Sequence, residues 1–218
     1  PYMRDTGKLR QMYSNINADN TPYKGQAMVQ YEEGIYVGYR YYETAHDIGK
    51  EGFDYDEAVT YPFGYGLSYT TFSQRIVDSS LGGDEMTVTV EVTNTGDTYS
   101  GKDVVQLYVT LPYTAGGIEK SRVQLVDFAK TDMLEADGSQ TVTFTVDAYA
   151  LASYDYNDAN SNGFMGYELD PGDYIFYAAK NSHIDDPANV YASATVELSS
   201  NIQFAEDPET GNTVVNRY

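Results

Sequence analysis

Residues 86–96 read MTVTVEVTNTG, and this stretch decides the fold class. Its apolar side chains stand at every second position, with threonine or glutamate between them. Successive side chains of a β-strand point to opposite faces, so a period of two predicts a strand with one buried and one solvent-facing side. Asn94 and Gly96 are turn residues and end the run.

The same alternation recurs along the chain from about residue 70 onward. Further strands are expected at residues 70–77, 104–109, 123–126, 142–146, 174–179 and 190–198. About seven short antiparallel strands with Gly-containing turns between them predict a mainly β fold, a β-sandwich of the immunoglobulin or fibronectin type III-like kind. Residues 1–72 show no comparable period and do not form a domain of their own.

Composition limits the possible functions. The 218 residues include 33 acidic and 13 basic side chains, for a net charge of −20. That charge repels phosphate backbones and anionic lipids, so neither nucleic acid nor a membrane surface is an expected partner. The absence of cysteine excludes disulfides and thiolate sites, and it is compatible with a cytoplasmic or a secreted bacterial protein. No apolar run approaches the ~20 residues of a membrane span.

The acidic charge is concentrated in residues 131–218, which hold 15 acidic side chains against Lys180 and Arg217. Within this part, residues 158–163 (DANSNG) match the opening of an EF-hand calcium loop, although position 12 is not the usual glutamate. An Asn- and Gly-rich turn without metal explains the same letters and is favoured. No other cofactor is expected. The candidate calcium ligands are Asp158, Asn160, Asn162, Glu168 and Asp170.

Two segments resemble a known family more specifically than any periodicity can. Residues 31–44 (YEEGIYVGYRYYET) and 60–72 (TYPFGYGLSYTTF) are similar to stretches of glycoside hydrolase family 3, and residues 94–109 resemble the "NTG…VVQLYV" strands that follow in that family. The resemblance implies that residues 1–72 are the C-terminal remnant of an α/β-sandwich domain with its linker. It further implies that residues 73–200 are a fibronectin type III-like domain and residues 201–218 a linker towards a missing domain.

The resemblance also implies an activity for the parent enzyme, a retaining β-glucosidase that hydrolyses terminal β-linked sugars in oligosaccharides or β-glucosides. The family's catalytic Asp and Glu lie on a TIM-like barrel and in the α/β sandwich, and neither motif occurs in these residues. No catalytic residue is therefore carried over, and the chain alone is expected to be inactive. The missing barrel and α/β-sandwich domains are the expected partners. The tail at residues 213–218 resembles the linker of a subgroup whose barrel comes last.

The tyrosine-rich stretch at residues 31–44 allows two interpretations. Tyr36, Arg40 and Tyr41 could bind substrate, because aromatic rings stack on sugars and a guanidinium hydrogen-bonds hydroxyls. They could equally pack at a domain interface, which is the favoured interpretation. A stand-alone immunoglobulin-like carbohydrate-binding or adhesion module is the alternative function for the whole chain.

Two further expectations concern packing and histidines. The rings at positions 61, 63, 65 and 69 are expected to be buried, with positive φ at Gly64 or Gly66. His46 and His183 are the only histidines and are expected in solvated loops, which argues against a Ser–His–Asp site.

Overall fold

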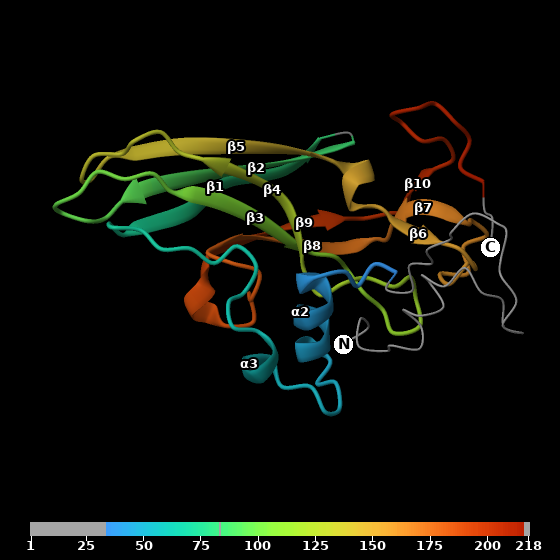
Figure 1. Cartoon of the computed structure of the whole chain (residues 1–218). Helices are drawn as coiled ribbons and strands as arrows, with labels where there is room; N and C mark the ends of the chain where they lie inside the picture. Colours follow the sequence, from blue (N-terminus) through green and yellow to red (C-terminus); the bar gives the residue numbers. More distant parts are fainter. Residues whose placement is uncertain (1–33, 83, 216–218) are drawn as a thin grey trace, which may run out of the picture. The chain divides into compact units, whose positions relative to one another are not determined.

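The computed structural model describes residues 34–82 and 84–215 (Figure 1). The chain divides into two units, residues 1–37 and residues 38–218. Of the first unit only residues 34–37 are described. Residues 31–33, the start of the stretch at 31–44, therefore lie outside the described residues. The architecture below is that of the second unit.

Two antiparallel sheets form a β-sandwich, as the alternation predicted. The first sheet has the order β1-β2-β5, with β1 at Phe72–Gly82, β2 at Glu85–Asn94 and β5 at Ser139–Asp147. The second has the order β4-β3-β8-β9, with β3 at Val104–Thr110, β4 at Gln124–Lys130, β8 at Gly172–Ala179 and β9 at Val190–Leu198. A mainly β, fibronectin type III-like fold is therefore confirmed.

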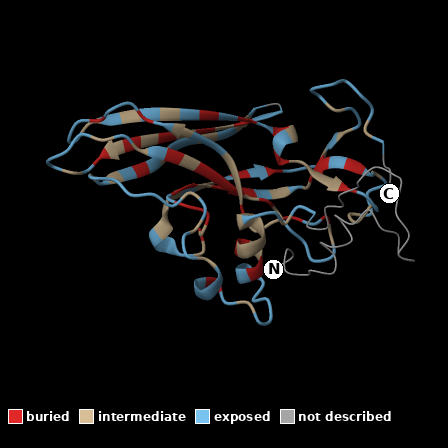
Figure 2. Ribbon diagram, in the orientation of Figure 1, coloured by how far each residue is buried: buried red, intermediate tan, exposed pale blue. Residues whose placement is uncertain are grey.

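The core lies between the two sheets and is built from their alternating inward side chains (Figure 2). Every second residue of β2 from Met86 to Val92 is fully buried, and β2 pairs with β5 so that Val88 lies opposite Phe144. Leu107 of β3 and Phe176 of β8 are buried in the same cluster from the second sheet. Full burial of each such side chain stabilises the fold by about 1.5–3 kcal/mol.

A third, small sheet has the order β10-β7-β6, with β6 at Ser153–Asp155, β7 at Gly166–Leu169 and β10 at Ile202–Phe204. Strand β10 pairs with β7 and places Ile202 opposite Leu169. Residues 202–204, at the start of the segment expected to be a linker, thus pair with the small sheet. Three-residue strands are too short for alternation to reveal them.

The described helices are short and were not expected from periodicity. Helix α2 spans Tyr39–Asp47 and α3 spans Tyr55–Ala58, and the 3-10 helices η2 and η3 span Ala148–Leu151 and Pro187–Asn189. Asp54 caps α3 by accepting a hydrogen bond from the backbone N–H of Glu57. Within the described residues, no helix has the length and apolar character to cross a membrane.

We expect the folded chain to lose stability in alkali because of buried tyrosines. Burial raises the pKa of Tyr108 and Tyr174, which are 0% and 1% exposed, above the ordinary value of 10.0. The unfolded chain ionises these phenols near pH ~10 while the folded chain keeps them neutral, so their contribution is intact below that pH and is lost as pH rises further. Urea unfolding on both sides of pH ~10 measures the loss.

A matched pair of variants tests the cause. Tyr174→Phe should reduce the steepness of the alkaline decline by up to about 1.4 kcal/mol per pH unit. Tyr69→Phe should leave it unchanged, because the Tyr69 side chain is 97% exposed. Equal slopes for both variants and the unmodified chain would contradict this explanation.

Candidate functional site

Residues 60–72, here called the strap, are fixed to the sandwich by their main chain. The side-chain amide of Gln106 donates to the carbonyl oxygens of Gly64 (3.0 Å) and Lys180 (2.9 Å). The backbone N–H of Ser182 donates to the carbonyl oxygen of Phe63 (2.8 Å). The Tyr108 hydroxyl donates to Gln106 Oε1 (2.8 Å) and so holds the amide in this orientation.

Two glycines permit this close approach. Gly64 has φ of 87°, which confirms the expected positive φ, and a Cβ there would lie 2.0 Å from Gln106 Oε1. A Cβ at Gly96 would lie 2.1 Å from Thr70 Oγ1, which itself donates to Asn94 Oδ1 (2.7 Å). The glycines of the two motifs therefore make room for the strap at both of its ends.

The expectation that all four strap rings are buried is wrong. Tyr61 is 67% exposed and Tyr69 is 97% exposed. Phe63 stacks on Tyr39 with ring centroids 4.5 Å apart, yet it is still 47% exposed, and Tyr65 contacts chiefly Tyr61 at 5.0 Å. Because the strap turns its carbonyl groups toward β3, most of its aromatic surface points away from the sandwich.

Helix α2 is joined to the sandwich through the buried carboxylate of Glu43, which is 2% exposed. It accepts hydrogen bonds from the hydroxyls of Tyr55 (2.7 Å) and Ser182 (2.8 Å). Burial, together with the neighbouring Glu43, raises the pKa of Tyr55, which keeps this phenol a donor. Nδ1 of His183 lies 2.9 Å from Glu43 Oε2.

This arrangement corrects the expectation for His183. The His183 ring is not solvated but stacks on Tyr55 with centroids 4.0 Å apart. His46 is exposed but lies in α2 rather than in a loop, and its ring is edge-on to Tyr55 (5.2 Å) and His183 (5.0 Å). The Ser182 hydroxyl donates to Glu43 and not to an imidazole, so these residues do not form a nucleophile–base pair. The cluster is suited to holding α2 in place.

A second polar junction surrounds Arg122. Its Nη2 lies 2.6 Å from Asp185 Oδ1 and its Nε lies 2.9 Å from Asp47 Oδ1 at the end of α2. Burial opposes the charge, but the two carboxylates outweigh burial and raise the pKa of the guanidinium. The backbone N–H of Arg122 also donates to Thr44 Oγ1 (2.9 Å).

The candidate substrate-binding residues belong to different units of the chain. Tyr36 lies in the short described part of the first unit, and Arg40 is half-buried on α2. Tyr41 packs against Tyr42 and Phe53, with centroids 5.5 and 6.2 Å away, and its hydroxyl accepts a hydrogen bond from Lys50 Nζ (2.7 Å).

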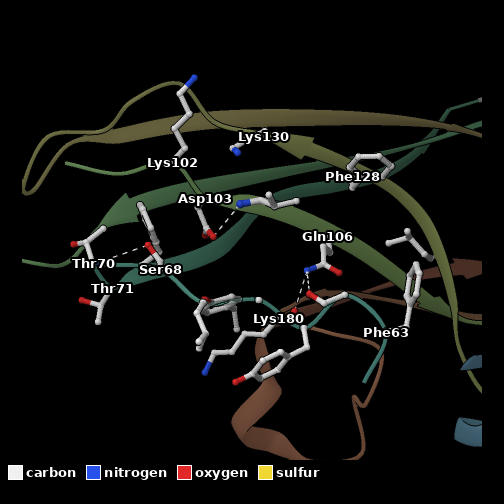
Figure 3. A pocket seen from close by; sticks show the side chains of 18 residues that line it. Phe63, Ser68, Thr70, Thr71, Lys102, Asp103, Gln106, Phe128, Lys130 and Lys180 are labelled. Carbon is white, nitrogen blue, oxygen red and sulfur yellow. Dashed lines mark hydrogen bonds between the residues drawn. The ribbon is translucent and has the colours of Figure 1, made fainter. Parts of the chain in front are cut away.

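The pocket of the second unit lies along the strap and has a volume of about 670 Å³ (Figure 3). Neither Arg40 nor Tyr41 lines it. Its walls come from the strap, from β3 and β4, and from the start of β9. Figure 3 shows Lys102, Lys130 and Phe128 on one side of Gln106 and Lys180 on the other. No sequence pattern indicates this pocket, because its lysines come from separate strands and loops.

The five candidate calcium ligands are drawn together only in part. Asp158 Oδ1 accepts hydrogen bonds from the backbone N–H groups of Asn162 and Gly163 and so closes a turn. The side-chain amides of Asn160 and Asn162 donate to the fully buried carboxylate of Glu168 at 3.2 and 2.7 Å. Their N–H groups, rather than their oxygens, face the acid.

The positive charge beside Asp170 is supplied by a lysine side chain rather than by a metal ion. Lys120 is buried and forms an ion pair with Asp170, which also accepts a hydrogen bond from Asn160. Gln203 of β10 adds a donor to Glu168 (3.2 Å). In the part of the chain that the structure describes, no three His, Cys, Asp or Glu side chains are grouped in a way that could hold a metal ion.

Comparison with known proteins finds relatives that cover most of the chain. Residues 103–182 match the model of the fibronectin type III-like domain family. β-Glucosidase A of Butyrivibrio fibrisolvens is 37% identical over 193 residues, which cover 80% of this chain and 21% of that protein. The exo-α-(1→6)-L-arabinopyranosidase of Bifidobacterium longum is 39% identical over 161 residues, or 70% of this chain and 19% of that protein.

The structure of β-glucosidase 3B from Thermotoga neapolitana in complex with α-D-glucose superposes with a TM-score of 0.64. It is 33% identical, and the match covers 85% of this chain and 22% of that one. The chain is thus a β-glucosidase-like segment of glycoside hydrolase family 3. It spans about a fifth of the length of these relatives.

The motifs that resemble glycoside hydrolase family 3 contain the residues that hold the strap in place. The residues of the glycoside hydrolase family 3 motifs are those that clamp the strap: Gly64, Gly96, Gln106 and Tyr108. Gly64, Gln106 and Tyr108 meet at one place, and Gly96 makes room for Thr70 further along the strap. In this chain the shared motifs serve to hold the strap against the sandwich.

We predict that Glu43→Ala lowers the free energy of unfolding by about 2–6 kcal/mol, because each of the two buried hydroxyl donors left without an acceptor costs about 1–3 kcal/mol. The substitution leaves the Tyr55 and Ser182 hydroxyls and His183 without their common acceptor. Glu51→Ala is the control, because Glu51 is exposed in a loop. Urea unfolding followed by circular dichroism compares the two variants, and similar losses would contradict a supporting role for Glu43.

We predict that calcium leaves the thermal melting temperature of the chain unchanged. The loop at residues 158–163 already satisfies its polar groups internally, and Lys120 already neutralises Asp170. A metal that binds only the folded state must raise the melting temperature. Melts in EDTA and in calcium up to ~10 mM, above the weak range of extracellular calcium modules, decide the question. A rise that disappears in Asp158→Asn would support the calcium hypothesis instead.

Proposed function

We propose that this chain is a non-catalytic accessory part of a family 3 glycoside hydrolase, whose complete form is a retaining β-glucosidase acting on terminal β-linked sugars. The observation that carries the proposal is the clamp on the strap, which ties the segment before residue 72 to a fibronectin type III-like sandwich. The β-glucosidases among its relatives support the substrate class.

In this proposal the three parts of the chain have different roles. Residues 1–72 complete the α/β-sandwich domain and its linker, residues 73–200 form the accessory sandwich, and residues 201–218 lead towards a further domain. The TIM-like barrel and the rest of the α/β sandwich are the partners, and they carry the nucleophile and the acid. No cofactor is required.

We assign Arg40 and Tyr41 to packing rather than to sugar binding. Tyr42, Phe53 and Lys50 already contact the Tyr41 ring, and a saccharide would have to displace them to stack there. The packing of Tyr41 argues against sugar stacking at this ring, and the similarity to β-glucosidases of which the chain spans about a fifth favours the accessory role over a stand-alone carbohydrate-binding module.

The isolated 218-residue chain should not hydrolyse aryl β-glucosides. Retaining glycosidases need two carboxyl groups about 5–5.5 Å apart on either side of the bond to be broken. The most buried glutamates, Glu43 and Glu168, are fully engaged with hydroxyl, imidazole or amide partners. Release of p-nitrophenol is the measurement, with the B. fibrisolvens β-glucosidase A as positive control.

Contaminating activity is separated from activity of the chain by variants. Turnover that persists through purification and is abolished by Glu43→Gln or Glu168→Gln would overturn the proposal. Each variant is checked for folding by its melting temperature, so that loss of activity is not confused with loss of structure.

A further inference from the structure

The pocket beside the strap is a basic site on an acidic chain. Three of the eight lysine and arginine residues that the structure describes line it: Lys102, Lys130 and Lys180. Asp103 is the only acidic residue in its lining. The whole chain carries a net charge of −20, so this concentration of positive charge is local.

The pocket lysines differ from three of the other basic side chains in what they contact. Arg75, Lys120 and Arg122 each form an ion pair with a carboxylate. Lys102 and Lys130 are exposed and form no such pair with any residue of the described chain. Lys180 donates to the carbonyl oxygen of Ala188 (2.7 Å) and lies over the Tyr191 ring.

The acid in the lining does not neutralise these charges. Asp103 Oδ2 accepts from the side-chain amide of Gln74 (2.8 Å), and its Oδ1 accepts from the backbone N–H of Val104 (2.9 Å). Both oxygens thus point to neutral donors. The lysine ammonium groups remain available to a ligand of opposite charge.

Exposed apolar side chains line the same pocket. Phe128 is 64% exposed, Leu67 is 89% exposed and Val104 is 37% exposed. Single exposed apolar residues are ordinary, but a group of them in one concave surface marks a contact site. The surface continues onto the outward rings of the strap, of which Tyr65 also lines the pocket.

We propose that the strap pocket binds an acidic protein segment that carries aromatic or aliphatic side chains, supplied by another domain of the same enzyme. The inference rests on the proposed accessory role and adds the chemistry of the partner. Charge complementarity selects an acidic segment, and the exposed Phe128, Leu67 and Val104 select apolar side chains within it. The relatives are long enough to supply such a segment, because this chain spans about a fifth of them.

Two other occupants fit less well. A saccharide needs free hydrogen-bonding groups, but the Gln106 amide is already bonded to Gly64 and Lys180, and its oxygen accepts from Tyr108. A second copy of the chain would bring another net charge of −20, and the long-range repulsion opposes that association.

A fluorescently labelled random copolymer of glutamate and tyrosine is a direct probe of the site. Anisotropy titrations of the full 218-residue chain should show saturable binding that weakens when salt is raised from ~0.1 M to ~1 M, since the Debye length falls from ~10 Å to ~3 Å. Polyglutamate should bind more weakly than the copolymer, because it lacks side chains for the apolar surface.

Matched variants locate the binding. The double variant Lys102→Gln/Lys130→Gln should weaken copolymer binding roughly 10-fold. Arg75→Gln removes the same kind of charge from the outside of β1 and should change the affinity by less than about 2-fold. Phe128→Ser should weaken binding of the copolymer but not of polyglutamate. All these side chains are exposed, so melting temperatures should stay close to that of the unmodified chain.

Several results would overturn the assignment. These are absence of saturable binding, equal affinity for polyglutamate and copolymer, preference for polygalacturonate, and a lysine-dependent dimer in sedimentation. None of them bears on the hydrolysis assay of the accessory role, which measures turnover of an aryl glucoside. The two proposals therefore fail independently.

Discussion

The hydrogen bonds from Gln106 and Ser182 to the carbonyl oxygens of Gly64 and Phe63 determine how the strap is attached to the sandwich. Gln106 lies on β3, an inner strand of its sheet, so the donor is carried by a rigid element. Its amide cannot rotate without losing the Tyr108 hydroxyl and the carbonyl of Lys180. A side chain at residue 64 would clash with Gln106, so only glycine permits the hydrogen bond from Gln106 to the carbonyl oxygen of this residue. This position therefore fixes the path of the strap.

The sandwich and the segment before it are stabilised by different forces. The sandwich has its own apolar core between the two sheets, and of the strap rings only Phe72, where the strap joins β1, packs against it. Helix α2 and the strap are held instead by directed polar contacts at Glu43 and Arg122 and by the stacking of Tyr39 on Phe63. Directed contacts specify orientation more than they add stability. This suits the accessory role proposed above.

The sequence predicts those features that depend on local pattern. The strands of the sandwich follow from alternation as clear as that around Val88, and the turn at Gly64 follows from its neighbours. Helix α2 does not follow, because its aromatic residues are weak helix formers and Glu43 is buried only by contacts distant in sequence. The burial of strap rings was mispredicted because an apolar side chain does not indicate which face it will occupy. The amino acids at residues 158–163 supply the side-chain oxygens that calcium needs. The sequence does not show that the amide N–H groups of Asn160 and Asn162, rather than these oxygens, face Glu168.

The contacts of Glu43 also have a consequence for the order of folding. Ser182 and His183 lie 139 and 140 positions later in the chain than their partner. Closing so long a loop costs more entropy than forming the adjacent β8–β9 hairpin, and contacts of large sequence separation form slowly. On a ribosome, α2 and the strap emerge long before the loop that receives them. The rings that these contacts cover in the folded chain, Tyr39 and Tyr55, therefore remain exposed until nearly the whole sandwich has been synthesised. Exposed apolar surface of this kind makes a nascent chain prone to aggregation and dependent on chaperones.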